Sequence, residues 1–421
     1  MPIGGSIYIH KHKKKRRMQM GKLFSVADIL MPDINKTNMS KWSCIACDQF
    51  TSEGEYWHSV EEYVGDAHST LGLFLPEIYL GRAESSIPEI NVRMQEYIDS
   101  CLCEHRNAMI YLRRTIPDGR VREGIVGKVD LEEYDYRKGS RASVRATEET
   151  VLDRIPPRVA IRRDAVIELP HIMMLYDDPE DSLCRVLSDK TTEHTPAYGF
   201  DLMMGAGHIE GYFLNADMAE YVSDFIENKR TDGLALCVGD GNHSLASAKA
   251  LYEEIKASIG EDAAREHPAR YALCEIVNIH SSALDFEPIH RLIVGCNVKE
   301  LLSFLESECK SPDAHTLRYV TSDGEGEIRV DRTEAGISVD PLQRLLDRYL
   351  EDHAGEIDYI HGDSSLARLA SAENAIGIYC EPISKGGLFE AVRAGGSLPR
   401  KTFSMGVALE KRHYLEARKI K

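Results

Sequence analysis

The sequence predicts an α+β fold, and three stretches carry that prediction. Residues 108–116 and 121–129 are apolar-rich runs joined by Pro117-Asp118-Gly119-Arg120, a turn sequence that predicts a β-hairpin. Residues 200–214 predict a second hairpin around a glycine turn. Residues 234–255 combine a short apolar strand, another glycine turn and a helical pattern. Hairpins set among helices favour α+β over a regular βαβ winding.

The other elements follow from apolar spacing. In chain order we expect a loop at residues 42–50, a strand at 167–176, a helix at 217–228, strands at 270–279 and 288–294, a helix at 298–309, a helix at 342–350, and strands at 357–360 and 376–380 flanking another helix. The stretch between the helices 298–309 and 342–350 is polar and rich in Gly, Asp and Glu, and no regular element is predicted there.

The chain of 421 residues has room for two or three domains. Residues 1–20, with a dense basic run, predict a disordered extension, and Met18 or Met20 is an alternative start. We expect a main domain at residues 21–296 and a smaller C-terminal α/β part at 297–421. Its closing segment, residues 398–404, is expected to return to the main domain.

The net charge and the length of the apolar runs limit the partners and the location that we expect for this protein. A net charge of −17 disfavours a nucleic-acid partner, because most of the surface would repel a polyanion. No apolar run reaches the roughly 18 residues of a membrane span, and no secretory signal follows the basic run. We therefore expect a cytoplasmic protein that binds no membrane; the oligomeric state stays open.

The ten cysteines predict reduced thiols. Cys44-x-x-Cys47 and Cys101-x-Cys103 invite a zinc interpretation, since four thiolates suit a tetrahedral site. The second pair lies on an expected helix, where a spacing of two residues turns side chains apart. Thiols packed as small hydrophobic groups are therefore the default expectation.

The turn Gly239-Asp240-Gly241-Asn242-His243-Ser244 follows a buried strand and opens a helix. The first N–H groups of a helix lack internal partners and receive anions, so we interpret this turn as a phosphate or nucleotide cradle. An ordinary capped helix is the alternative, although a cap does not need Asp240 and His243 as well. The turn fits neither the dinucleotide nor the P-loop fingerprint.

Five motifs together closely resemble a prokaryotic family, the domain-of-unknown-function family ten-fifteen. They are Trp42-Ser43-Cys44-Ile45-Ala46-Cys47-Asp48-Gln49-Phe50, Arg145-Ala146-Thr147-Glu148 with Asp153-Arg154, the glycine turn at residues 239–244, Pro288-Ile289-His290-Arg291 and Pro399-Arg400-Lys401-Thr402-Phe403. The resemblance spans essentially everything after Met20, with the motifs in matching order.

That family's turn in turn resembles the phosphate-binding turn of the ParB/sulfiredoxin fold, which includes partition proteins, sulfiredoxin and archaeal kinases of free serine. The resemblance implies a ParB/sulfiredoxin-like mixed sheet core with added hairpins. It also implies a nucleotide-dependent kinase for a small hydroxylated metabolite, such as the free amino acid serine. Many relatives carry Arg where this chain has Ser244, which removes a fixed positive charge from the cradle.

Phosphoryl transfer needs a held nucleotide, cations around the phosphoryl group and a carboxylate that orients the acceptor. The expected catalytic residues are Asp48 on the acceptor side with Glu148 in reserve, Asp240 and His243. The expected phosphate-binding residues are Gly241, Asn242, Ser244, Arg145, Thr147, Arg154, His290, Arg291 and Lys401. Asp240 is the expected ligand of Mg²⁺, with ATP or ADP as the co-substrate.

Two other functions remain open from the sequence. A non-catalytic nucleotide sensor would use the same turn without turnover. A ParB-like nucleic-acid-associated protein is the third alternative, and the acidic net charge makes it the least favoured.

Overall fold

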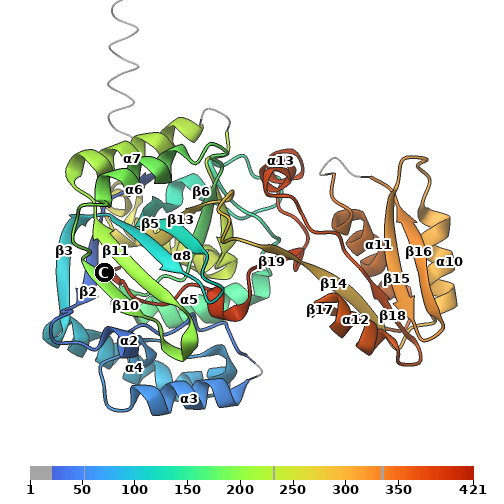
Figure 1. The fold of residues 1–421 in the computed structure, drawn as a ribbon, viewed down its shortest axis with the longest axis horizontal. Coiled ribbons are helices and arrows are strands. Elements are labelled where there is room, and N and C mark those ends of the chain that lie inside the picture. The colour runs from blue at the N-terminus through green and yellow to red at the C-terminus, as the bar shows by residue number, and fades with distance from the viewer. Residues whose placement is uncertain (1–20, 52, 231–232, 333–335) are drawn as a thin grey trace, which may run out of the picture.

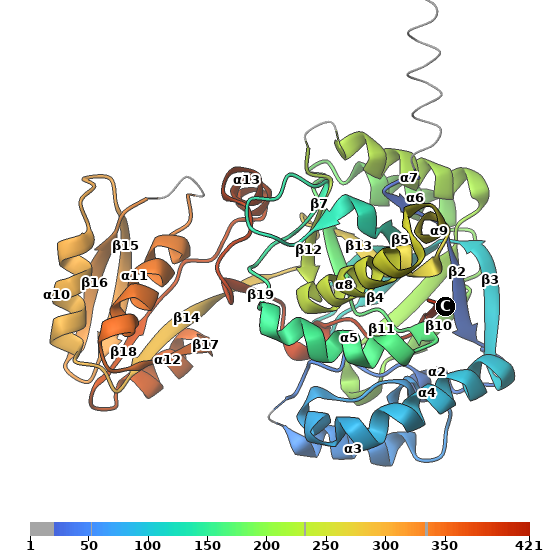
Figure 2. The ribbon, with the colours of Figure 1, turned by 180° about the vertical axis from the view of Figure 1, so that it is seen from behind.

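The computed structural model describes residues 21–51, 53–230, 233–332 and 336–421. The expected basic extension at residues 1–20 lies outside these described residues. The architecture is mixed α+β, with a large mixed sheet and a smaller second sheet beside it, as Figures 1 and 2 show. The α+β class predicted from the sequence is confirmed.

Among the described residues, ten strands form the larger sheet. In spatial order they are β10 (Tyr198–Asp201), β11 (His208–Phe213), β4 (Ile110–Thr115), β5 (Val121–Asp130), β13 (Tyr271–Asn278), β9 (Met173–Tyr176), β12 (Leu236–Asp240), β7 (Val144–Ala146) and β6 (Tyr134–Asp135), with β1 (Phe24–Ser25) paired to β5. Both predicted hairpins are present, as the antiparallel pairs β4–β5 and β10–β11.

One predicted strand is interrupted. Residues 167–176 form two short strands, β8 (Ile167–Glu168) and β9, instead of one. Pro170 lies between them and has no N–H to donate to a strand ladder. As a result β8 leaves the large sheet and pairs with β20 (Arg418–Lys419) at the end of the chain.

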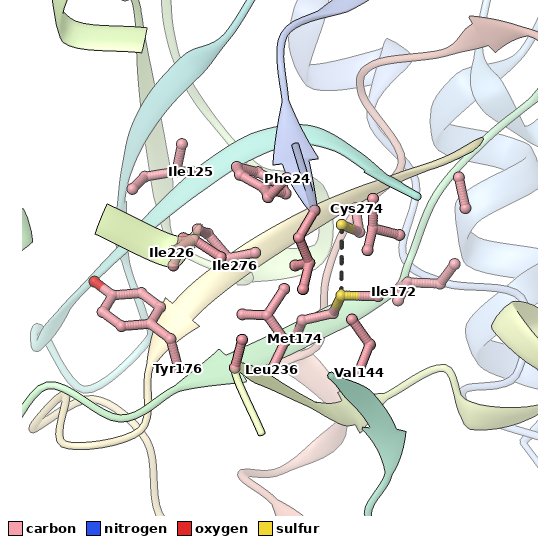
Figure 3. Close-up of a cluster of buried hydrophobic side chains, with 14 of the residues drawn as sticks. Phe24, Ile125, Val144, Ile172, Met174, Tyr176, Ile226, Leu236, Cys274 and Ile276 are labelled. Carbon is pink, nitrogen blue, oxygen red and sulfur yellow. Dashed lines mark hydrogen bonds between the residues drawn. The ribbon is translucent and has the colours of Figure 1, made fainter. Parts of the chain in front are cut away.

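Helices cover one face of the large sheet. They are α6 (Ser182–Thr191), α7 (Ala216–Lys229) and α8 (Asn242–Ile259), with α9 (Glu261–Arg265) after α8. Their apolar sides meet the sheet in a buried cluster that includes Phe24, Ile125 and Met174 (Figure 3). Cys274 Sγ lies 3.7 Å from Met174 Sδ inside it, so this thiol packs as a small apolar group.

The opposite face carries the N-terminal elements and the C-terminal segment. They are the antiparallel pair β2 (Ala27–Pro32) and β3 (Leu102–Ala108), the helices α2 (Met39–Trp42), α3 (Gly54–Val64) and α4 (Ala83–Ser100), and residues 409–420. Trp42 donates its indole N–H to the carbonyl of Leu415 at 3.0 Å. This bond fixes the loop that begins the first motif against the end of the chain.

The smaller sheet consists of β14 (Phe286–Val294), β15 (His315–Thr321), β16 (Gly324–Val330), β17 (Glu356–His361), β18 (Ala375–Ile378) and, paired to the start of β14, β19 (Phe403–Met405). Helices α10 (Val298–Glu308) and α11 (Val339–Asp352) cover one face and α12 (Asp363–Ala370) the other. The hairpin β15–β16 occupies the polar stretch for which no element was predicted. Its outward residues are charged, so the alternation that marks a half-buried strand was overlooked.

Two remaining helices and the short 3₁₀ turns complete the part of the chain that the structure describes. They are α5 (Ile155–Asp164), α13 (Lys385–Gly395), η1 (Thr70–Leu73), η2 (Glu77–Arg82), η3 (Leu131–Glu133), η4 (Leu152–Arg154), η5 (Met203–Gly205), η7 (Pro268–Arg270) and η8 (Ala408–Glu410). Across the described residues, no helix combines the length and the apolar character that a membrane crossing requires.

Candidate functional site

The glycine turn joins β12 to α8, as predicted. Gly241 has a φ of +81°, a left-handed conformation that glycine adopts without strain, and a Cβ there would lie 3.1 Å from the Cα of Ile172. A Cβ on Gly239 would come within 2.8 Å of Met405 Sδ. Gly241 therefore lets the chain turn tightly against Ile172, and Gly239 lets it pass close to Met405 of β19.

The turn presents the open N-terminus of α8. No side chain caps this helix, so the first amides, those of Asn242, His243 and Ser244, lack a partner of the usual capping kind among the described residues. Asn242 Oδ1 is likewise buried without a hydrogen-bond partner within the described ranges. An 18-residue helix adds its dipole to these groups. The turn is thus prepared to receive an anion.

A cavity of about 960 Å³ lies over the turn, between the two sheets. Residues 239–244 form its floor, and His361 and Gly362 at the end of β17 come from the smaller sheet. Its charged lining comprises Asp48, Glu77, Glu148, Glu149, Asp240, Glu287, Arg154, Arg158, Lys401 and Lys411. The volume suits a ligand of cofactor size.

Asp240 stands at the end of β12 and is paired. Its Oδ2 lies 3.3 Å from Lys411 Nζ, and its Oδ1 accepts the N–H of Gly241 at 2.9 Å. Each carboxylate oxygen keeps a second lone pair, so Asp240 retains acceptor capacity toward the cavity.

Asp48 belongs to a hydrogen-bonded group at one end of the cavity. Its Oδ2 lies 3.8 Å from His171 Nε2. His171 is buried, with Nδ1 2.8 Å from Tyr414 Oη and Nε2 3.1 Å from Ser244 Oγ. Burial opposes ionisation of Asp48, yet His171, the amide of Gln49 and Lys411 together hold its pKa below the ordinary value. Asp48 is therefore an ionised acceptor at neutral pH.

Glu148 lines the cavity and accepts hydrogen bonds from the loop that carries Lys401. It accepts main-chain N–H groups of Lys401, Thr402 and Phe403 at 3.1, 3.0 and 3.4 Å. Burial raises its pKa against the effect of these donors. Because its oxygens are taken up by the loop, the structure assigns Glu148 to holding Lys401 in place, and not to the reserve acceptor role expected from the sequence.

Two cations of the cavity are unpaired. Within the described part of the chain, Arg154 and Lys401 make no ion pair, whereas Arg158 pairs with Glu77 and Lys411 with Asp240. Arg154 ends η4 and Lys401 lies in the loop before β19, with a left-handed φ of +58°. Both are exposed, so both are available to a negatively charged ligand.

His243 lies on the first turn of α8 and is neutral. Val151 N donates to its Nε2 at 3.3 Å, which places the remaining proton on Nδ1. Burial, helped by Arg158 and Arg154, lowers the pKa of His243 to about 4. The neutral ring keeps one N–H donor at Nδ1 and adds no charge at pH 7.

This pKa makes a prediction about stability. The unfolded chain binds a proton on His243 below about pH 6.5 while the folded chain does not until about pH 4, so the stability that the neutral ring contributes is present above pH 6.5 and lost as the pH falls through this window. We expect His243→Gln to flatten the decline in the free energy of unfolding between about pH 7 and pH 4.5. Urea denaturation at several pH values measures it. The exposed His194→Gln should leave the decline unchanged; an unchanged decline in His243→Gln would contradict the prediction.

Four predicted phosphate-binding residues do not line the cavity. Arg145 donates to the carbonyls of Ala142, Val392 and Gly233, and Thr147 Oγ1 donates to that of Val238 at 2.7 Å. These side chains are buried and their donors are used by the main chain. Both residues therefore donate to main-chain carbonyls, and neither lines the cavity.

His290 and Arg291 are the other two. His290 lies between Asp363 and the N–H of Cys380. Arg291 is fully buried and donates to Gln343 and to the carbonyls of Ile289, Arg400 and Lys401. Arg291 thus holds the main chain of the Lys401 loop. The motif at residues 288–291 therefore lies beside the cavity, but the guanidinium of Arg291 bonds acceptors inside the cavity wall.

The zinc alternative has no support in the described residues. No three His, Cys, Asp or Glu side chains among them are arranged to hold a metal ion, and the described cysteines are free. Burial, followed by the neighbouring Asp48, raises the pKa of Cys47 to about 12, which keeps the thiol protonated. Cys44 is packed in the core, in agreement with the default expectation.

Sequence reasoning missed several cavity residues. His171, Lys411, Glu77 and Arg158 line this cavity, and Tyr414 lies outside it and bonds His171. Their sequence context offered one signal: His171 follows Pro170 at the break between β8 and β9, where a polar residue in an apolar run is out of place. Lys411 and Tyr414 come from the end of the chain, and Glu77 and Arg158 come from η2 and α5, so only the folded chain brings them together here.

The chain matches one family model and is similar to several solved structures. A family model described as Protein of unknown function (DUF1015) matches residues 32–349. No curated protein matches the chain. Among solved structures it is similar to SbnI with C-terminal truncation from Staphylococcus aureus, at 11% identity over 67% of this chain and 82% of that one, with a TM-score of 0.36.

Two more solved structures are similar at the same level. A conserved hypothetical protein from Pyrococcus furiosus is 9% identical over 70% of this chain and 94% of that one, with a TM-score of 0.37. A free serine kinase variant in complex with ADP is 12% identical over 72% of this chain and 95% of that one, with a TM-score of 0.39.

Proposed function

The chain belongs to the family described as Protein of unknown function (DUF1015), and from that premise we propose that it is a nucleotide-dependent phosphotransferase acting on a small hydroxylated metabolite. One observation carries the proposal. The cavity joins an uncapped helix N-terminus, two unpaired cations and two carboxylates within one space of about 960 Å³. Phosphoryl transfer requires this set of parts.

The cradle would hold the phosphates of ATP or ADP. Amides of Asn242, His243 and Ser244 supply neutral donors, and Arg154 and Lys401 supply charge from the rim. Arg154 is the better suited of the two for phosphate oxygens because its guanidinium donates in a planar fork. These donors are already in place, so charge that develops on the moving phosphoryl group meets prearranged dipoles.

Asp48 would orient the acceptor hydroxyl. It is ionised, it lies beside His171, and it lines the same cavity as the cradle. A carboxylate in this position accepts the hydroxyl proton as the oxygen bonds to phosphorus and the bond from phosphorus to the leaving nucleotide breaks. His171, fixed by Tyr414 and Ser244, holds Asp48 in place.

The lining fits Mg²⁺ that arrives with the nucleotide. Carboxylates outnumber cations around the cavity, so a polyphosphate needs a further positive charge there. Mg²⁺ is commonly bound by one or two carboxylates together with substrate phosphates, and Asp240 keeps an acceptor site for it. The ion would neutralise phosphate charge during transfer.

We include the ParB/sulfiredoxin-like core in the proposal. Its support is the unit β12, glycine turn and α8, which has the order of strand, phosphate-binding turn and helix that the family's motif resembles. Neighbouring β7 and β9 flank β12 in the mixed sheet.

The test is direct transfer of label. The purified full chain is incubated with γ-labelled ATP or β-labelled ADP, Mg²⁺ and a panel of hydroxylated metabolites that includes L-serine. We expect a labelled small molecule that disappears when EDTA removes Mg²⁺. Nucleotide binding in calorimetry with no product from any acceptor would instead support the nucleotide sensor.

Arg154→Gln should weaken nucleotide binding by about tenfold or more, because a charge-assisted hydrogen bond to phosphate is lost. Calorimetric titration with ADP and Mg²⁺ measures the dissociation constant. Arg163→Gln is the matched control, since Arg163 is exposed, pairs with Glu254 and lies outside the cavity. Equal affinities in the two variants would remove Arg154 from the phosphate site.

A further inference from the structure

A second, smaller hollow adjoins the proposed site. Its volume is about 210 Å³, and it lies between η2 and α4 on one side and α5 on the other. Its lining is mainly apolar and includes Phe74, Leu80, Ile87, Ile90, Met94 and Ile161. We call it the apolar chamber.

The apolar chamber shares a wall with the polar cavity. Cys47, Glu77, Arg158, His171 and Ser244 line both spaces. The two spaces therefore meet at these five side chains, which include the His171 that lies beside the proposed acceptor carboxylate.

The shared lining residues show where the chamber meets the polar cavity. Nε2 of His171 lies 3.8 Å from Oδ2 of Asp48 and 3.1 Å from Oγ of Ser244. The unpaired cations Arg154 and Lys401 line only the polar cavity. The chamber thus meets the polar cavity at Ser244 of the cradle and beside Asp48, and not at the two unpaired cations.

Some chamber side chains are left open to solvent. Leu80 is 44% exposed, and Ile87 of α4 and Ile161 of α5 are half-buried and both line the chamber. Half-exposed apolar groups gathered around a hollow beside a polar site are typical of a ligand pocket. An apolar group placed there would remove these side chains from water.

We propose that the acceptor substrate carries an apolar group beside its hydroxyl, and that this group occupies the apolar chamber while the hydroxyl meets Asp48. The inference rests on the proposed phosphotransferase function and narrows its substrate class to alcohols with an apolar side. Serine, which lacks such a group, would leave the chamber empty. The volume exceeds the roughly 150 Å³ that accommodates benzene in a protein cavity, so a chain of four to six carbons or one ring fits.

Linear primary alcohols from 1-propanol to 1-hexanol are the probes. Burying a methylene strengthens binding by about fourfold, so the dissociation constant should fall by that factor with each added carbon. Saturation-transfer NMR on the full chain with ADP and Mg²⁺ measures the series. A dissociation constant that does not fall with chain length overturns the proposal.

Ile87→Trp fills the chamber from α4. Ile87 lies outside the buried core clusters, so the variant should fold, which circular dichroism checks. We expect it to abolish the gain with chain length and to leave ADP affinity unchanged. Val92→Trp on the same helix, where the side chain is 60% exposed and lines no chamber, is the matched control.

The outcomes distinguish failure of the chamber proposal from failure of the proposed phosphotransferase function. Loss of ADP affinity in Ile87→Trp, with alcohol binding intact, would show that the chamber holds the nucleobase and would overturn the proposal. An unaltered alcohol series in Ile87→Trp would overturn it as well. Absence of labelled product in the transfer assay, by contrast, refutes the phosphotransferase function whatever the alcohols do.

Discussion

Asp48→Asn is expected to reduce the rate of phosphoryl transfer by about 100- to 10,000-fold, the usual contribution of a positioned general base. The amide keeps the size of the side chain and loses the charge that accepts the hydroxyl proton. Because Asp48 is assigned to the acceptor hydroxyl and not to the phosphates, ADP affinity should change little. Single-turnover assays with labelled nucleotide measure the rate, and calorimetry measures the affinity.

Asp66→Asn is the control for this experiment. Asp66 is exposed after α3 and lies outside the cavity, so its replacement should leave the rate unchanged. A rate in Asp48→Asn within a factor of a few of the parent protein would remove Asp48 from the chemistry. Equal losses of rate and nucleotide affinity would place it at the phosphates instead.

Arg291→Met is expected to lower the free energy of unfolding by about 3 kcal/mol, because a buried charged donor that serves several acceptors is removed at once. Arg291 is fully buried and bonds Gln343 at 2.9 Å and the carbonyl of Lys401 at 2.7 Å. Methionine replaces the stem but leaves these acceptors unsatisfied in the interior. Chemical denaturation followed by circular dichroism measures the change.

Arg332→Met tests whether the loss is specific to burial. Arg332 is half-exposed and pairs with Asp313 at 3.2 Å, and such surface pairs contribute at most about 1 kcal/mol. We expect its free energy of unfolding to stay close to that of the parent protein. If Arg291→Met is no less stable than Arg332→Met, Arg291 does not hold the Lys401 loop.

Local signals predicted much of the fold. The hairpin β4–β5 and the helix α8 were both found, because turn residues and helical spacing act over a few positions. The hairpin β15–β16 was missed, since its exposed, charged edge weakens the alternation. The split at Pro170 was missed too, although the missing N–H of proline is a local fact.

The candidate site was predicted unevenly for a related reason. Asp48, Arg154, Asp240 and Lys401 do line one cavity, whereas Arg145 and Arg291 are buried in its walls. A motif marks where arginine is needed but not whether its donors meet a ligand or a carbonyl. Burial decides that, and burial depends on how segments distant in sequence pack.

The sequence by itself determined the α+β class, the family and the turn between β12 and α8, because each depends on residue types at short spacings. Only the tertiary structure decided which charges remain free. It brought Lys411 against Asp240 and Tyr414 against His171, from the far end of the chain, and set the apolar chamber beside them. Contacts between such distant residues follow from packing and desolvation of the whole molecule, and no local pattern contains them.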